Sequence, residues 1–300
     1  MAFFGQAPQE QSRDLSEVCD NANFDIVILA FITSLNPPKL NMGKDTGSPS
    51  EAQTKAGLTE LFDGTFTPDG KQSVADQIAG CQGKGKKIMV SFGGDERFSN
   101  ATFESADEAK EAANQAWNLF LGGRDSEDLR PFGRDITLDG LDLDNESGDG
   151  SFYNEFVTEL RTKMDADASR EYLLSANPMC AVFNQPESSI PNSVFPMLDF
   201  ISVQFYNNQP QGIGGADFES TIKTWAEKIA EANRPKIFLG IPGGPGAAGS
   251  NVQSPDEIKK TIESVKAMNL PGFGGVGIWD AAFAMAEDGM PEAVKGSLAV

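Results

Sequence analysis

One segment of the chain reads Asp139-Gly140-Leu141-Asp142-Leu143-Asp144-Asn145-Glu146. Residues two apart in a strand face the same side, so in a strand Asp142, Asp144 and Glu146 would form one row and the two leucines would face the opposite way. A buried row of three acids is costly unless the acids share protons or meet a ligand. A solvated acidic strand edge fits badly, because the interleaved residues are leucines. We therefore interpret the row as a functional site.

Short apolar runs recur along the chain, and polar stretches with a helical pattern follow them. The runs are mostly unbroken rather than alternating, which is typical of parallel strands covered on both faces. The pattern predicts an α/β fold, a (β/α)8 TIM barrel over residues 1–300 as a single catalytic domain, with the site at the C-terminal ends of the strands. The expected strands are 2–5, 25–31, 87–92, 140–144, 172–176, 200–205, 236–241 and 276–279, and the clearest helices are 73–84, 107–121, 152–164, 221–232 and 256–268.

The composition excludes several classes of function. The formal net charge of −20 would repel nucleic acids and anionic membranes, but it suits a neutral substrate such as a sugar polymer. The chain has no histidine, which removes Ser-His-Asp and Cys-His mechanisms and nearly every zinc-hydrolase site. We expect no cofactor and no metal. Residues 244–249 formally match a dinucleotide fingerprint, but they include a proline and do not open a helix.

The sequence also bears on location and on thiol chemistry. No run of about 18 apolar residues indicates a membrane span, and residues 1–6 lack the pattern of a signal peptide. The protein is therefore expected either to stay in the cell or to be numbered from a mature N-terminus with an added methionine. Cys19, Cys81 and Cys180 are too few and too scattered for a zinc cluster. They are either three free thiols or one disulfide and one free thiol.

The acid row predicts a glycosidase. Mutual repulsion can keep one carboxyl of the row protonated at neutral pH, which a general acid for glycosidic cleavage requires. Asp144 and Glu146 lie about 7 Å apart by strand rise. They approach a sugar from one side, so Asp144 is poorly placed as an opposite-face nucleophile. The remaining nucleophile is the 2-acetamido oxygen of the substrate itself, as in substrate-assisted glycosidases.

Three motifs resemble one enzyme family. Residues 139–146 resemble the active-site signature of glycoside hydrolase family 18, and residues 91–94, Ser-Phe-Gly-Gly, resemble its second motif. Residues 204–208, Gln-Phe-Tyr-Asn-Asn, resemble the class III, hevamine-type chitinases of plants and fungi. Two places depart from the family pattern: Phe3-Phe4 stands where a Tyr-Trp pair is usual, and Ala7 stands where the subgroup has Asn.

The resemblance implies a role for each matching residue. Glu146 would protonate the leaving oxygen, while Asp144 would orient the acetamide group, stabilise an oxazolinium intermediate and share a proton with Asp142. Tyr206 would donate its hydroxyl to the acetamide oxygen. Asp139 faces away from the row by strand parity and is expected to be structural. Further substrate-site residues expected from the resemblance are Gln204 beside the acetamide, Trp279 as the floor, Asn207, Gln6, Phe31, Gly94, Asn41 and Ser91.

The resemblance therefore implies a retaining endochitinase that hydrolyses β-1,4 links between N-acetylglucosamine units. Its partners would be chitin and chitin oligosaccharides, and we expect a monomer with an extracellular location, a cytoplasmic one being the alternative. Two other functions share the barrel: a non-catalytic chitin-binding lectin or inhibitor, and an endo-β-N-acetylglucosaminidase acting on N-glycans. The presence of both Glu146 and Asp144 favours an enzyme, and the segment around Tyr206 favours a chitinase.

A disulfide is also implied by the resemblance. Cys19 and Cys81 match a bridge of the class III subgroup. Cys180 matches a cysteine whose partner position falls in residues 208–211, which contain no cysteine, so Cys180 would be free. A bridge would favour a secreted protein, because cytosolic disulfides are rare.

Two further features concern the backbone and the cleft. Ala30–Phe31 and Trp279–Asp280 match positions at which the family carries cis peptide bonds. Another branch of the family inserts an α+β domain between the seventh and eighth strands. Only residues 242–275 separate those strands here, and a helix already occupies part of them, so we expect no insertion domain and an open cleft.

Overall fold

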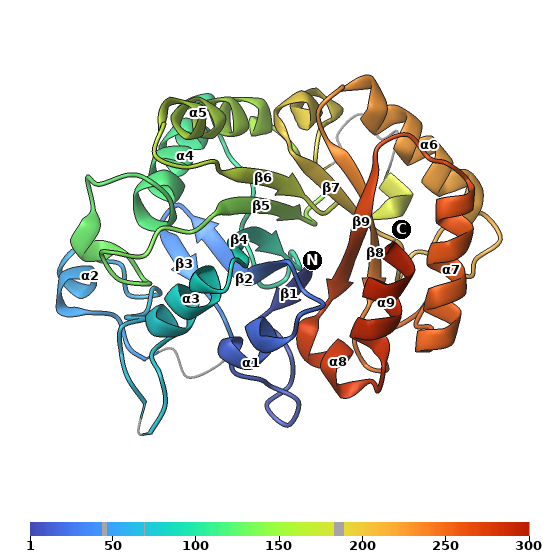
Figure 1. Cartoon of the computed structure of the whole chain (residues 1–300). Helices are drawn as coiled ribbons and strands as arrows, with labels where there is room; N and C mark the ends of the chain where they lie inside the picture. Colours follow the sequence, from blue (N-terminus) through green and yellow to red (C-terminus); the bar gives the residue numbers. More distant parts are fainter. Residues whose placement is uncertain (44–46, 69, 183–188, 300) are drawn as a thin grey trace.

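The computed structural model describes residues 1–43, 47–68, 70–182 and 189–299. Within these residues the sheet has nine strands in the order β1-β9-β8-β7-β6-β5-β4-β2-β3, and a further pairing of β1 with β2 closes a barrel. All pairings around the barrel are parallel, so the predicted (β/α)8 fold is confirmed (Figure 1). The barrel strands are β1 (Ala2–Phe4), β2 (Ile26–Leu35), β4 (Lys87–Gly94), β5 (Gly140–Asn145), β6 (Leu173–Ala176), β7 (Phe200–Gln204), β8 (Lys236–Pro242) and β9 (Phe273–Trp279).

Helices surround the barrel, and several begin at a capping serine. Ser73 and Ser105 accept hydrogen bonds from the backbone of the first helical turn, and Ser254 forms a capping box ahead of a first-turn proline. Because one helix, α7, connects β8 to β9, the predicted absence of an insertion domain is confirmed. The helices are α1 (Leu15–Asp20), α2 (Glu51–Lys55), α3 (Val74–Gly83), α4 (Ala106–Phe120), α5 (Tyr153–Ala166), α6 (Phe218–Glu231), α7 (Pro255–Ala267), α8 (Ala281–Ala286) and α9 (Met290–Leu298), with short 3-10 helices η1 (Glu127–Leu129), η2 (Cys180–Val182) and η3 (Asn192–Met197).

The second strand is longer than the predicted 25–31. β2 continues to Leu35 and then pairs antiparallel with β3 (Pro38–Leu40), after a turn at Asn36-Pro37. The apolar run of the sequence ends at Ile32, and the strand continues through the polar pair Thr33-Ser34, which the apolar pattern does not predict. This hairpin extends β2 past the barrel rim, and it therefore contributes residues to the C-terminal face.

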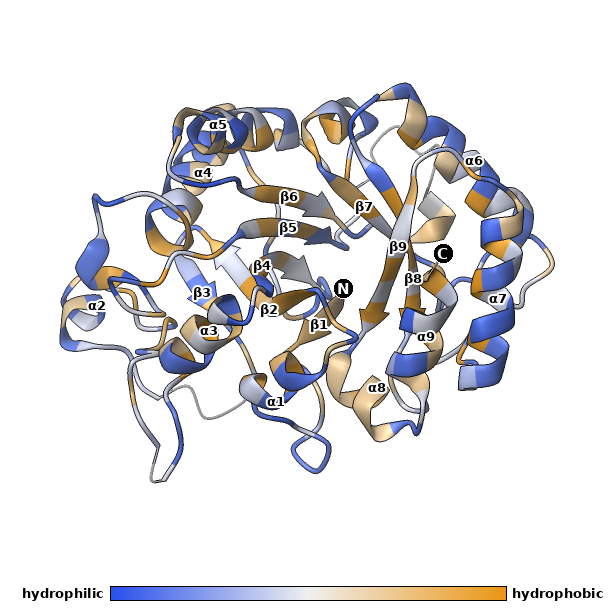
Figure 2. Cartoon of the chain, in the orientation of Figure 1, coloured by the Kyte–Doolittle hydropathy of each residue, from blue (hydrophilic) through white to orange (hydrophobic). Residues whose placement is uncertain are grey.

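Two layers of apolar side chains fill the molecule. The larger layer lies between strands and helices and contains Leu141 and Leu143. A smaller cluster inside the barrel contains Phe3, Phe31 and Phe200. Hydrophobic residues accordingly concentrate on the strands, while the surrounding helices carry many hydrophilic residues (Figure 2). The acids of β5 face the inner layer, as strand parity predicts.

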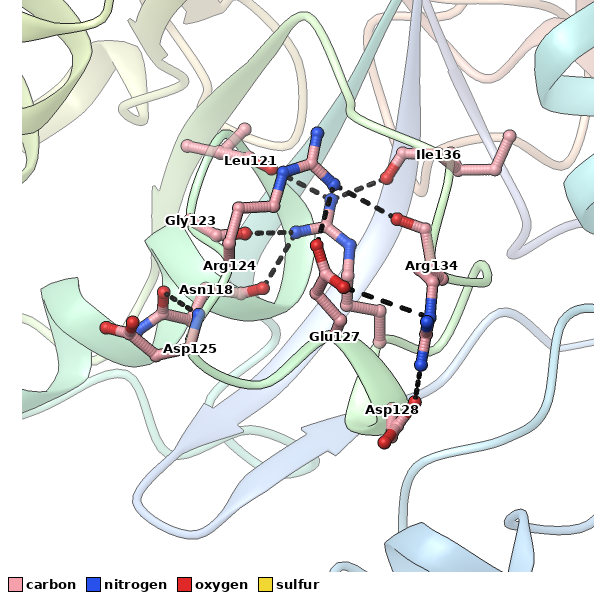
Figure 3. Close-up of polar contacts among 10 residues, drawn as sticks. Asn118, Leu121, Gly123, Arg124, Asp125, Glu127, Asp128, Arg134 and Ile136 are labelled. Atoms are coloured by element: carbon pink, nitrogen blue, oxygen red, sulfur yellow. Dashed lines mark hydrogen bonds and ion pairs between the residues drawn. The ribbon is translucent and has the colours of Figure 1, made fainter.

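Arg130 organises the chain between α4 and β5. Its guanidinium is buried and donates to the carbonyl oxygens of Asn118, Gly123, Leu121 and Ile136. Figure 3 shows these carbonyl groups gathered around one position, with the ion pairs of the flanking residues outside them. Burial lowers the pKa of Arg130 to about 10, which leaves it charged at neutral pH. The arginine thus fixes the segment that leads into β5.

The covalent and backbone predictions are confirmed. A disulfide joins Cys19 on α1 to Cys81 on α3, with 5.4 Å between the Cα atoms, and Cys180 is a buried free thiol. The Ala30–Phe31 and Trp279–Asp280 peptide bonds are both cis. In the part of the chain that the structure describes, the helices are too short or too polar to cross a membrane.

Candidate active site

A cavity of about 370 Å³ opens at the C-terminal ends of the barrel strands. Ten of the residues predicted for the site lie in its wall, and two others, Asp142 and Ser91, lie beneath it without belonging to the lining. The lining consists of Gln6, Phe31, Thr33, Asn41, Gly93, Gly94, Asp95, Phe98, Ser99, Asp144, Glu146, Gln204, Tyr206, Asn207 and Trp279.

Asp142 forms the base of the acid row. Its side chain is fully buried and accepts hydrogen bonds from Ser91 Oγ at 2.7 Å and Ser175 Oγ at 2.6 Å. Burial raises the pKa of Asp142 to about 6, although the two hydroxyls act in the opposite direction. Ser91 therefore contacts an acid of the row and does not line the cavity.

Asp144 lies above Asp142 and depends on two amide side chains. Its Oδ1 accepts from Gln204 Nε2 at 2.9 Å and from Asn177 Nδ2 at 3.3 Å. Burial, together with the charges of Glu146 and Asp142, raises the pKa of Asp144 well above its usual range. A proton can therefore reside within the row at neutral pH.

Glu146 follows the end of β5 and faces the cavity. Gln204 Nε2 lies 3.1 Å from its Oε1, so the same amide nitrogen contacts both upper acids of the row. Burial raises the pKa of Glu146, the Gln204 hydrogen bond lowers it, and the charges of Asp95 and Glu96 raise it further. A protonated carboxyl at the cavity wall is able to act as a general acid.

Tyr206 and the aromatic floor complete the centre of the site. Burial and the nearby acids raise the pKa of Tyr206 well above its usual range, so its hydroxyl remains a donor. The rings of Phe31 and Trp279 are stacked with centroids 5.6 Å apart, and Phe3 meets Trp279 edge-on at 5.5 Å. Phe3 thus belongs to the packing of the floor, whereas Phe4 packs against the outer layer.

Two glycines allow β4 to pass close to the acids. Gly93 has φ +124°, and a Cβ there would lie 2.3 Å from the carbonyl oxygen of Asp144. Gly94 has φ +89°, and a Cβ there would lie 3.0 Å from the Phe31 ring. A larger residue at either position would displace Asp144 or the floor.

Polar residues at the rim use part of their hydrogen-bonding capacity within the protein. Gln6 Nε2 donates to the carbonyl oxygens of Ala30 at 2.8 Å and Asn41 at 3.0 Å. Asn207 Oδ1 accepts from the backbone N–H groups of Gly249 at 2.8 Å and Ser250 at 3.1 Å. Gln6 and Asn207 therefore join loops of different strands as well as lining the cavity.

Sequence reasoning missed part of the site. Thr33, Asp95, Phe98 and Ser99 line the cavity, and Asn177 supports Asp144 from below. Thr33 lies in the C-terminal part of β2, Asp95, Phe98 and Ser99 lie in the loop after β4, and Asn177 directly follows β6. This location was the available signal, since the C-terminal strand ends of a barrel and their loops form its site. Asp139, expected to be structural, accepts from Gln82 Nε2, Lys87 Nζ and the Ile88 N–H outside the row.

The acids of the wall lie on neighbouring strands. Among the lining residues the carboxylates are Asp95, Asp144 and Glu146, which follow or belong to β4 and β5. Such a site can protonate a leaving oxygen and orient an amide. Among the lining residues, no carboxylate comes from the opposite side of the barrel.

Comparisons with known proteins give a consistent result. The model of glycosyl hydrolases family 18 matches residues 1–255. Endochitinase 3 of Metarhizium anisopliae is 35% identical over 288 residues, which cover 95% of this chain and 93% of that protein. The solved structure of the chitinase ICChI from Ipomoea carnea has a TM-score of 0.78 at 26% identity and covers 99% of this chain and 98% of its own.

A neighbour with a different activity is nearly as similar. The xylanase and alpha-amylase inhibitor protein XAIP-II from Scadoxus multiflorus has a TM-score of 0.76 at 27% identity, over 98% of this chain and 97% of its own. The barrel alone therefore does not distinguish hydrolysis from inhibition, and the distinction depends on side chains in the cavity.

Proposed function

The chain belongs to glycosyl hydrolases family 18, and on this premise we propose that it is an endochitinase that cleaves β-1,4 links between N-acetylglucosamine units of chitin with retention of configuration. The observation that carries the proposal is the acid row with its shared donor: Gln204 Nε2 contacts Asp144 and Glu146, and Asp142 lies beneath them. The proposal takes residues 1–300 as one catalytic domain.

The proposed reaction has two displacements. In the first, Glu146 gives its proton to the bridging oxygen while the acetamide oxygen of the sugar bonds to the anomeric carbon, so the leaving chain departs with a hydroxyl group. Asp144 accepts from the acetamide N–H, Tyr206 donates to the acetamide oxygen, and Trp279 supports the ring. In the second, Glu146 takes a proton from water, whose oxygen opens the cyclic oxazolinium ion and restores the acetamide.

The cavity favours this route over a protein nucleophile. A retaining enzyme with its own nucleophile needs two carboxyl groups about 5–5.5 Å apart across the sugar. Asp144 and Glu146 approach from the same strand and contact the same amide nitrogen, so neither is placed on the opposite face. The 2-acetamido group of chitin supplies the missing nucleophile.

The decisive experiment compares the wild type with Glu146→Gln on chitin hexasaccharide. The variant keeps the shape of the side chain but has no proton to give, so hydrolysis should fall by about 10²–10⁴-fold or more while binding persists. Early-time NMR of the wild-type products should give the β-anomer first. Wild-type turnover by the variant, or initial release of the α-anomer, would contradict the mechanism.

A non-catalytic binding protein or inhibitor remains the second candidate, because XAIP-II shares the barrel. The paired acids favour the enzyme, since a binding protein has no need of a proton donor in its cavity. Hexasaccharide binding by the wild type without any product would favour this second candidate. An endo-β-N-acetylglucosaminidase would instead release sugar from N-glycans and leave chitin intact.

The location follows from the same proposal. Chitin is a polymer of cell walls and surfaces, and the Cys19–Cys81 disulfide fits an oxidising compartment. We therefore include an extracellular, monomeric enzyme in the proposal. Sedimentation analysis tests the monomeric state, and thiol titration of the purified protein without reductant tests the disulfide on which the location rests.

A further inference from the structure

Phe98 is the most exposed large hydrophobic residue among those described, with 74% of its surface accessible. Phe66, at 52%, and Phe152, at 36%, come next. Single exposed hydrophobic residues are ordinary on a protein surface. Phe98 differs from the other two in position, because it lies in the wall of the cavity that contains Glu146.

The loop after β4 holds this ring in place. The N–H groups of Phe98 and Ser99 donate to the carbonyl oxygen of Asp95 at 2.9 and 3.1 Å, and Ser99 Oγ donates to the carbonyl oxygen of Gly94 at 3.0 Å. Arg97 Nε contacts both carboxylate oxygens of Asp95 at 2.9 and 3.1 Å. The Arg97 guanidinium also lies 5.4 Å from the centre of the Phe98 ring, so the loop backbone is held by hydrogen bonds and the ring has one cation–π contact.

The Phe98 ring and Trp279 come from strands that are not neighbours in the barrel. Trp279 ends β9, whereas Phe98 follows β4, and β1 and β2 separate these two strands in the barrel. A sugar whose acetamide group is held by Asp144 rests on Trp279 in the proposed function. Phe98 is therefore available to a different unit of the same polymer.

We propose that Phe98 is a sugar-binding platform, whose ring stacks against a second N-acetylglucosamine unit of chitin bound in the same cavity. The inference rests on the proposed function and adds a subsite to it. The C–H faces of a pyranose ring are apolar and match an aromatic surface, while its hydroxyl and acetamide groups need polar partners at the ring edge. Asp95 and Ser99, which also line the cavity, supply such partners.

The test measures binding without turnover. In a Glu146→Gln parent, calorimetric titration with chitin hexasaccharide should give an affinity about 3- to 10-fold weaker after Phe98→Ala, since a lost aromatic contact costs about 0.5–1.5 kcal/mol and 1.4 kcal/mol is tenfold. Phe98→Trp should restore the parent affinity. Phe66→Ala removes another exposed ring, 52% accessible and outside the cavity lining, and should leave the affinity unchanged.

The outcomes separate this inference from the function on which it rests. Unchanged affinity after Phe98→Ala, or equal loss after Phe66→Ala, would overturn the platform while hydrolysis by the wild type still upheld the enzyme. A tryptophan variant as weak as the alanine variant would also count against stacking. If the parent did not bind the hexasaccharide and the wild type did not cleave it, both proposals would fail together.

Discussion

At the scale of single residues, the site depends on how one amide nitrogen is shared. Gln204 Nε2 lies 2.9 Å from Asp144, 3.1 Å from Glu146 and 2.9 Å from the carbonyl oxygen of Asn177. An amide nitrogen has two hydrogens, so three acceptors cannot each receive a full hydrogen bond. The protonation of one acid therefore changes the donor available to the other, and the titration belongs to the pair.

Charges on the loop after β4 should shift the pH profile in opposite directions. The Asp95 charge raises the pKa of Glu146 and the Arg97 charge lowers it. Asp95→Asn should therefore move the alkaline limb of kcat/KM for a chitin oligosaccharide to lower pH, because Glu146 loses its proton earlier. Arg97→Gln should move this limb to higher pH. Shifts of the same sign in both variants would contradict this electrostatic role.

Asp142 should make stability depend on pH. The pKa of Asp142 in the folded state is about 6, above its ordinary value of 3.8. The stabilisation of the folded state by the protonated Asp142 is therefore complete below about pH 4 and is lost as the pH rises through 6. The loss amounts to about 3 kcal/mol. The Asn side chain of Asp142→Asn cannot ionise. The free energy of unfolding in urea, measured for the variant relative to the wild type, should therefore increase between pH 4 and pH 8. A constant difference at the two pH values would be evidence against a raised pKa.

Strand parity predicted the acid row but not its partners. Asp142, Asp144 and Glu146 are two residues apart in one segment, so their common direction could be inferred from sequence. Ser175 and Asn177 come from β6 and its end, and their contact with the row depends on the register between β5 and β6. A single sequence does not contain that register.

At the scale of elements, length decided what could be predicted. Most barrel strands and the longer helices show apolar patterns that are long enough to recognise, whereas β1 has only three residues and was placed from the short apolar run at the start of the sequence. The helices α1 and α2 have six and five residues and β3 has three, which is too short for a reliable period. The hairpin of β2 and β3 and the cavity residues Thr33 and Asn41 were therefore harder to place than the barrel.

The segment before β5 should depend strongly on Arg130. Arg130→Met would remove the hydrogen-bond donors of four carbonyl oxygens, whose residues are labelled in Figure 3. Buried groups without partners cost about 1–3 kcal/mol each before relaxation, so we expect a loss of about 3–5 kcal/mol in the free energy of unfolding. Arg134→Met removes an exposed arginine of the same segment and should cost about 1 kcal/mol or less. Equal losses of unfolding free energy in the two variants would show that the buried hydrogen bonds of Arg130 contribute no more than the exposed contacts of Arg134.

At the scale of the whole molecule, the connection between β8 and β9 shapes the cleft. It contains α7 and no inserted domain, so no additional domain forms a wall of the groove there. A polymer could then lie across the site at any point along its length. The prediction of the open groove followed from counting residues 242–275, which made it one of the simpler inferences from sequence.

The expected open groove should lead to internal cleavage. On soluble chitin, viscosity should fall early relative to the release of reducing ends, and the first products should be oligosaccharides of mixed length. The Glu146→Gln variant serves as the control without hydrolysis in the viscosity measurement. Release of almost only disaccharide in the first minutes, with little fall in viscosity, would contradict an open groove.

The disulfide between Cys19 and Cys81 affects what happens to the molecule when a protease cuts it. It closes a ring of chain with a sequence separation of 62 residues, and this ring includes Phe31, Thr33 and Asn41 of the cavity wall. A single peptide cut between the two cysteines would yield fragments that remain covalently joined. The nicked molecule would keep its wall residues tethered beside the acids, and its two pieces would separate in electrophoresis only after reduction.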